Sequence, residues 1–250
     1  MWVFQLSLLF ITGIIIGSFL NVIIYRLPNN VSIVTPRSYC PHCRKTIPFY
    51  RNIPLLSFLF QKGRCAECRV KISFRYPVVE LLTGVLWMWA FSVYPLPKAL
   101  LFVWMSGILT VIAFIDAKHF TVPLSLIVAM FAVLFIYNIS EPTMVTDSII
   151  GGIVGTTYLG LVLGLTWLLF KKQTMGFGDL QLVFICGIWL GAIQVLLMIF
   201  MSSIIALFYW GFISFRSATQ RNQRLPFASF IAPVTIIIYA IGFEFTSLGL

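Results

Sequence analysis

The sequence predicts an all-α polytopic membrane protein. Of its 250 residues, 60% are hydrophobic and only 10% are charged, whereas about 25% of the residues of a soluble domain are charged. Long apolar stretches recur along the chain, and most of the Lys and Arg residues lie between them. Most of these stretches approach the roughly 20 residues that a membrane-spanning helix needs. These features exclude a water-soluble globular protein.

The apolar stretches predict about eight transmembrane helices. The first covers residues 2–25. No basic stretch precedes it and no small-residue cleavage site follows it, so we expect a retained helix and not a signal peptide. Its Gly13 and Gly17, four residues apart, would let a second helix approach closely. The other spans are expected at 78–93, 99–115, 123–139, 148–170, 179–190, 193–215 and 226–245. The break near Gly191 is the least marked, so hydropathy alone leaves seven or nine spans open.

The basic residues predict which side of the membrane each loop faces. Residues 26–77 hold ten of the seventeen Lys and Arg residues and one acid, Glu67. With eight spans and this loop in the cytoplasm, sixteen of the seventeen basic residues lie inside, Lys98 being the exception. The acids on the outer side would be Glu141, Asp147 and Glu244. By the positive-inside rule we expect both termini outside. The charge thus serves topology or contacts lipid headgroups, and we expect no nucleic-acid partner.

Four of the five cysteines predict a zinc site in this loop. Cys40 and Cys43 form one C-x-x-C pair, and Cys65 and Cys68 form a second. Two such pairs supply the four thiolates of a closed, structural tetrahedral site. Two disulfides, four reduced thiols, or His42 in place of one cysteine are the alternatives, and a cytoplasmic loop disfavours disulfides. We therefore expect a first helix (1–25), a zinc-stapled cytoplasmic domain (26–77) and a seven-helix domain (78–250).

Two acids in otherwise apolar helices predict an aspartyl site. Asp116 ends one apolar segment, and Asp179 follows Gly176 and Gly178 in the sequence Gly-Phe-Gly-Asp. A carboxylate within a membrane helix costs about 2.5–3.5 kcal/mol at mid-depth, so two of them require a reason. Both lie at the same membrane level in the eight-span arrangement. One ionised and one protonated carboxyl could hydrolyse an amide. Helix capping, or pairing with Lys118 or Lys172, are the alternatives.

Several residues have two possible roles. Gly176 and Gly178 would let substrate approach Asp179 closely, or they belong to an ordinary loop before a helix. Glu80 would bind the basic part of a substrate, or it pairs with Arg75. Asn21 and Arg26 would shape the floor of the site, or they anchor the end of the first helix.

The motifs occur in an order that resembles the prepilin peptidases, also called type IV leader peptidases. The resemblance lies in Gly17–Pro28, Cys40–Cys43, Arg51–Ser57, Gly63–Cys68, Ile72–Gly84, Asp116, Gly176–Asp179, Leu225–Phe227 and Ala232-Pro233. It implies a membrane aspartic endopeptidase with Asp116 and Asp179 as catalytic residues. Such enzymes cut the leader from prepilins or from pilin-like secretion and competence precursors at the cytoplasmic membrane face. Many also methylate the new amino terminus with S-adenosylmethionine, for which the sequence assigns no binding residue.

The chain departs from the family pattern at two places. Gln181 stands where the family often has Lys, and Phe227-Ala228-Ser229 stands where Gly and Pro commonly follow Phe. Three other functions stay open at this point. An ion-coupled transporter would place its acids near mid-bilayer at a repeat interface, a non-enzymatic adaptor would need the cysteines but not the acids, and a peptidase could lack methyl transfer.

Overall fold

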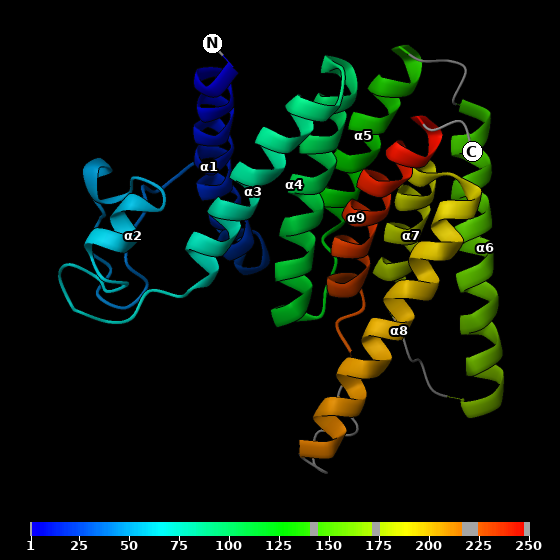
Figure 1. Cartoon of the computed structure of the whole chain (residues 1–250). Coiled ribbons are helices and arrows are strands. Elements are labelled where there is room, and N and C mark those ends of the chain that lie inside the picture. Colours follow the sequence, from blue (N-terminus) through cyan, green and yellow to red (C-terminus); the bar gives the residue numbers. More distant parts are fainter. Residues whose placement is uncertain (1, 141–144, 172–175, 217–224, 248–250) are drawn as a thin grey trace. The chain divides into compact units, whose positions relative to one another are not determined.

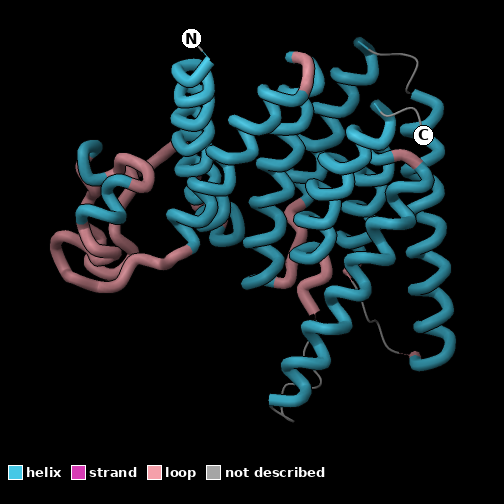
Figure 2. Tube along the Cα trace, viewed as in Figure 1, coloured by secondary structure: helices cyan, strands magenta, loops and turns pink. Residues whose placement is uncertain are grey.

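The computed structural model describes residues 2–140, 145–171, 176–216 and 225–247. In these ranges the regular secondary structure is helical, apart from isolated β-bridges in the loop after the first helix (Figure 2). The long helices are α1 (Trp2–Arg26), α3 (Arg75–Val93), α4 (Leu96–His119), α5 (Leu124–Ser140), α6 (Val145–Phe170), α7 (Phe177–Leu190), α8 (Ala192–Arg216) and α9 (Ala228–Ser247). The loop holds the short elements η1 (Leu27–Asn29), η2 (Phe49–Arg51) and α2 (Leu56–Phe60).

Each of the eight apolar segments is a helix. Among the described residues, α1, α3, α4, α6 and α8 are long and apolar enough to cross a membrane, and α5, α7 and α9 are shorter apolar helices. Helix α7 has 14 residues, so it is about 21 Å long at 1.5 Å per residue, against a hydrocarbon core of about 30 Å. The expected break is confirmed, because Gly191 has a φ of 86° and separates α7 from α8.

Asp116 ends its apolar segment, as expected, but not its helix. Helix α4 continues to His119, because backbone hydrogen bonds continue past the point where hydropathy falls. Asp116 therefore lies inside the last turn of a helix. Of the charges that supported the topology, Glu141, Lys172, Arg221 and Arg224 lie outside the described residues.

The chain divides into two compact units, residues 1–107 and 108–250, with the boundary inside α4. In the first unit α1 lies along α3 (Figure 1). A Cβ atom on Gly13 would be 2.7 Å from Cα of Gly84, and one on Gly17 would be 2.8 Å from Cα of Glu80. Side chains at these positions would push the helices apart, so the expected close approach is confirmed.

In the second unit α7 contacts α5, α6, α8 and α9 (Figure 1). Its contact with α6 is made by backbone, since a Cβ atom on Gly151 would overlap the carbonyl of Gly187. The side chains of Leu182, Val183 and Cys186 on α7 are fully buried. Cys186, the cysteine outside the zinc loop, thus packs as a small apolar side chain and accepts a 3.7 Å hydrogen bond from the Thr235 hydroxyl.

Candidate active site and metal centre

The four cysteines of the two C-x-x-C pairs sit on two turns of the same construction. In the first turn, the N–H of Cys40 donates to Lys45 O at 3.0 Å, and the N–H of Arg44 donates to Cys40 O at 2.8 Å. The second turn repeats both bonds twenty-five residues later, from Cys65 to Val70 O at 2.9 Å and from Arg69 to Cys65 O at 3.0 Å. Arg44 and Arg69 have φ values of 57° and 59°. The turns are therefore two copies of one knuckle.

The sulfur atoms are spaced for one zinc ion. The four Sγ atoms lie within 4.8 Å of one another, and those of Cys40 and Cys68 are 3.8 Å apart. Four sulfurs bonded to one zinc at about 2.3 Å would stand about 3.8 Å apart. All four cysteines are free thiols in the structure, and His42 is exposed. The donor set therefore fits a closed zinc site with four cysteine ligands, whose role is structural because no coordination position remains for water.

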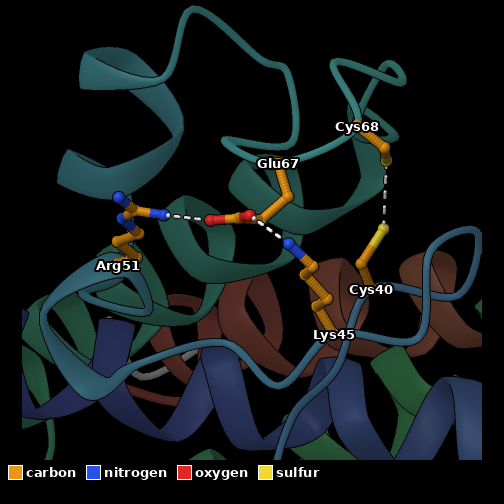
Figure 3. Close-up of polar contacts among 5 residues, drawn as sticks. All are labelled: Cys40, Lys45, Arg51, Glu67 and Cys68. Carbon is orange, nitrogen blue, oxygen red and sulfur yellow. Dashed lines mark hydrogen bonds and ion pairs between the residues drawn. The ribbon is translucent and has the colours of Figure 1, made fainter.

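An ion-pair bridge joins the two knuckles (Figure 3). Glu67, between Cys65 and Cys68, accepts hydrogen bonds from Lys45 Nζ at 2.7 Å and from Arg51 Nη1 at 3.0 Å. Both cations lower the pKa of Glu67, and Glu67 in turn raises the pKa of Lys45. The pairs are exposed to water, so they contribute little to stability. Metal binding, and not these ion pairs, must hold the knuckles together.

Asn21 and Arg26 anchor the loop to the first two helices. The Asn21 amide donates to Tyr76 O at 3.1 Å, and the buried Arg26 guanidinium donates to Ser32 O at 2.8 Å and to Pro36 O at 2.7 Å. A buried guanidinium needs such acceptors, because an unpaired buried charge is costly. Of their two possible roles, the structure shows helix-end anchoring.

Glu80 is buried, 6% exposed, and its Oε2 accepts a 2.8 Å hydrogen bond from the N–H of Leu55. Leu55 is the centre of a γ-turn, with φ 60° and ψ −52° and a 2.6 Å bond from Leu56 N–H to Pro54 O. This form of the γ-turn is strained. The alternative pairing of Glu80 with Arg75 is not formed, since the Arg75 guanidinium lies over the Tyr76 ring instead. Glu80 therefore holds a strained turn of the loop against α3.

Asp116 is 4% exposed and is surrounded by donors from the start of α9. Its Oδ2 accepts the N–H of Ser229 at 3.0 Å, and the Ser229 hydroxyl lies 3.2 Å from the same oxygen. Ser229 is far along the chain, and no spacing rule in the sequence relates it to Asp116. The departure from the family pattern at this position was the one available signal.

Asp179 is 8% exposed, at the third helical position of α7. Its Oδ2 accepts a hydrogen bond from the N–H of Gly176 at 3.2 Å. Asp179 therefore does cap the start of α7, which was one of the alternatives left by the sequence. In the described part of the chain neither Asp179 nor Asp116 forms an ion pair. Lys118 is thus not a partner of either, and Lys172 lies outside the described residues.

The second unit brings the two carboxyls together. The charge of Asp116 acts on Asp179, and the backbone N–H of Ala228 acts on both carboxyls. Two buried acids this close favour a shared proton. A carboxylate beside a carboxylic acid is the pairing that amide hydrolysis by water needs.

The two glycines of Gly-Phe-Gly-Asp differ in their surroundings. A Cβ atom on Gly178 would be 2.9 Å from Cβ of Val122, so Gly178 is required for packing. Gly176 has an extended backbone, and a Cβ atom there would meet nothing closer than Asp179 Oδ2 at 3.8 Å. Gly176 thus leaves open space beside the carboxyl of Asp179.

Comparison with known proteins identifies the family. The Bacterial Peptidase A24 N-terminal domain matches residues 11–94, and the Type IV leader peptidase family matches residues 100–211. The chain is 33% identical to a prepilin leader peptidase/N-methyltransferase of Bacillus subtilis, over 95% of both proteins. The chain belongs to the type IV leader peptidase family.

Two further relatives support the assignment to the leader peptidase family. A prepilin leader peptidase/N-methyltransferase of Neisseria gonorrhoeae is 33% identical over 82% of this chain and 80% of its own length. One from Myxococcus xanthus is 40% identical over 73% of this chain, a match that spans only 55% of that relative. No solved structure matches the chain. This leader peptidase is therefore a multi-pass membrane enzyme with a four-cysteine zinc site.

Proposed function

We propose that this chain removes the leader peptide from type IV prepilins or pilin-like precursors and methylates the new amino terminus. The observation that carries this function is the meeting of Asp116 and Asp179 in one buried site of a leader peptidase. Relatives that share its length are named for both activities. S-adenosylmethionine is the methyl donor that such an activity requires.

The aspartyl pair performs the cleavage. One carboxylate takes a proton from water as the water attacks the scissile carbonyl, while the other carboxyl donates its proton to the carbonyl oxygen. Burial of both groups strengthens these interactions, because little water screens them. Gly176 leaves room for the substrate backbone beside Asp179, and Glu80 remains a candidate contact for the basic leader. The zinc loop, residues 26–77, would lie with the aspartates on the cytoplasmic side, and both termini outside.

Cleavage of a precursor by purified protein in detergent tests the peptidase. Asp116→Asn and Asp179→Asn should each abolish cleavage while thermal unfolding stays near that of the unchanged protein. Asp147→Asn is the matched control, because Asp147 is an exposed acid in the first turn of α6. Near-normal turnover by either active-site variant would contradict the two-carboxylate mechanism.

Methyl transfer is tested in the same preparation. With labelled S-adenosylmethionine, the mature product should gain one methyl group at its amino terminus by mass measurement. Cleavage without that gain would identify a peptidase that lacks methyl transfer. Absence of cleavage together with ion-dependent uptake in proteoliposomes would favour the transporter instead.

A further inference from the structure

Ser229, at the start of α9, contacts Asp116 through two different groups. Its backbone N–H donates to Asp116 Oδ2 at 3.0 Å and also lies 3.2 Å from the carbonyl oxygen of Pro226. Its hydroxyl lies 3.2 Å from the same Oδ2 and 2.8 Å from the carbonyl oxygen of Ala113, one turn earlier in α4. The hydroxyl and the backbone N–H of Ser229 therefore both point at Oδ2 of Asp116.

The hydroxyl can serve both protonation states of Asp116. A serine hydroxyl has one proton to donate and lone pairs to accept, so it cannot donate to Ala113 and Asp116 at once. When Asp116 is ionised, the hydroxyl turns its proton to Oδ2. When Oδ2 carries a proton, that proton can be donated to Oγ while the hydroxyl donates to Ala113. Either state leaves the Ser229 hydroxyl bonded.

The backbone N–H is not adaptable in this way. An amide can only donate, so it always favours negative charge on Asp116. The N-terminal end of α9, where Ser229 is the second helical residue, adds to this preference. Asp179 accepts the N–H of Gly176, and no side-chain hydroxyl in the described ranges donates to it. Asp179 also lies in the first turn of a helix, α7, so the helix ends do not distinguish the two acids. The two donors of Ser229 therefore make the ionised form better supported at Asp116 than at Asp179.

We propose that Ser229 is a positioning residue that keeps Asp116 as the ionised member of the pair. Asp116 is then the general base that takes the proton from water, and Asp179 holds the proton given to the scissile carbonyl. This inference rests on the proposed function and adds the division of roles, which the sequence leaves open.

Because Ser229 lies in the first turn of α9, it can be replaced by proline to test both of its donors at once. Proline lacks both a hydroxyl and an N–H, and it is tolerated in the first turn of a helix. Ser229→Pro thus removes both donors to Asp116, together with the N–H bond to Pro226 O. Ser229→Ala removes only the hydroxyl, and Ser229→Thr keeps both donors. Thr235→Val is the matched control. Thr235 carries a buried hydroxyl on the same helix, and its hydrogen-bond partners are Ile231 O and Cys186 Sγ, not a carboxylate.

The experiment measures precursor cleavage by the full-length protein from pH 5 to 9. Loss of the N–H bond to a charged carboxylate should lower kcat about tenfold in Ser229→Pro. Ser229→Ala should lower kcat less, because it loses only the hydroxyl, which serves both protonation states. KM should not change, since Ser229 acts through Asp116. The acid side of the pH profile should move upward by about one pH unit in Ser229→Pro, and by less in Ser229→Ala. Ser229→Thr should restore the profile, and Thr235→Val should not alter it.

The outcomes separate this inference from the proposed function. If Asp116→Asn is inactive but Ser229→Ala and Ser229→Pro keep the original kcat and pH profile, the inference is wrong and the peptidase stands. If Asp116→Asn retains cleavage, the proposed function itself fails. Should Ser229→Ala lose its fold by thermal unfolding, the comparison of Ser229→Pro with Ser229→Thr decides the matter.

Discussion

Gly178 lies against Val122 so closely that a Cβ atom on the glycine would be 2.9 Å from Cβ of the valine. This contact joins the start of α7 to the segment that follows α4, and so holds Asp179 near Asp116. Gly178→Ala should therefore displace Asp179 and lower cleavage, with an overpacking cost of about 1–3 kcal/mol. Val122→Gly in the same chain, which removes the Cβ atom that the new methyl group meets, should restore part of the activity. Gly176→Ala, which meets no close atom, is the control and should fold normally.

The contact between Gly151 of α6 and Gly187 of α7 predicts a large effect on stability. Either glycine changed to Ala would place a methyl group against the backbone of the other helix, which cannot move aside as a side chain would. Thermal unfolding in detergent should show a clear loss of stability. Gly160→Ala and Gly164→Ala on the same helix are matched controls, because a Cβ atom there meets nothing within 4 Å. Equal effects at all four positions would refute the close contact.

The bond from Leu55 to Glu80 predicts that Glu80→Ala loosens the zinc loop. Without the carboxylate, the N–H of Leu55 loses its acceptor, at a cost of about 1–3 kcal/mol. Limited proteolysis should then cut the loop near residues 53–56 faster than in the unchanged protein. Leu55→Gly should partly correct the defect, because glycine adopts positive φ without strain. Glu67→Gln, which breaks only exposed ion pairs, should leave the cutting rate nearly unchanged.

The four-cysteine cluster predicts about one zinc per chain by metal analysis. Cys40→Ser or Cys65→Ser should lower the zinc content and expose the loop to proteolysis, since a small loop domain needs its metal to fold. A chain that lacks zinc and holds two disulfides would contradict the site.

Acid should release this zinc, because protons compete with the metal for the thiolates. The N–H groups of Cys68 and Glu67 lower the pKa of Cys65 to about 7. A lowered pKa means that the thiolate is available above that value and is lost as the pH falls through it. Because zinc itself keeps its thiolate ligands deprotonated, zinc retained after dialysis should decline only as the pH falls well below this value. Retention that is unchanged down to pH 4 would argue against thiolate ligands.

Much of the fold could be read from patterns that act locally. The apolar segments became helices because their backbone groups have no other partner in lipid. The C-x-x-C pairs marked the zinc knuckles because ligand spacing is itself a local property. The ends of the helices were predicted less accurately. Helix α4 continues past Asp116 to His119, because a helix can continue through a charged residue when its backbone hydrogen bonds allow it.

The candidate site was predicted in part. Asp116, Asp179 and Glu80 could be recognised as candidate site residues from the sequence, because acidic residues are rare in this chain. Leu55 and Ser229 were not assigned a role, because an ordinary leucine or serine becomes important only through a partner far along the chain. The pairing of Glu80 with Arg75 was wrong, since sequence proximity does not fix the direction of a side chain.

By itself, the sequence determined the membrane class, the family, the four zinc ligands and the two acids, because each depends on composition or on short spacings. Only the tertiary structure decided that Glu80 holds the γ-turn at Leu55, that Gly178 is needed against Val122, and that Ser229 meets Asp116. The physical reason is that these relationships depend on which backbone donors packing brings to a buried carboxylate. Packing is decided by the whole chain and not by any one segment of it.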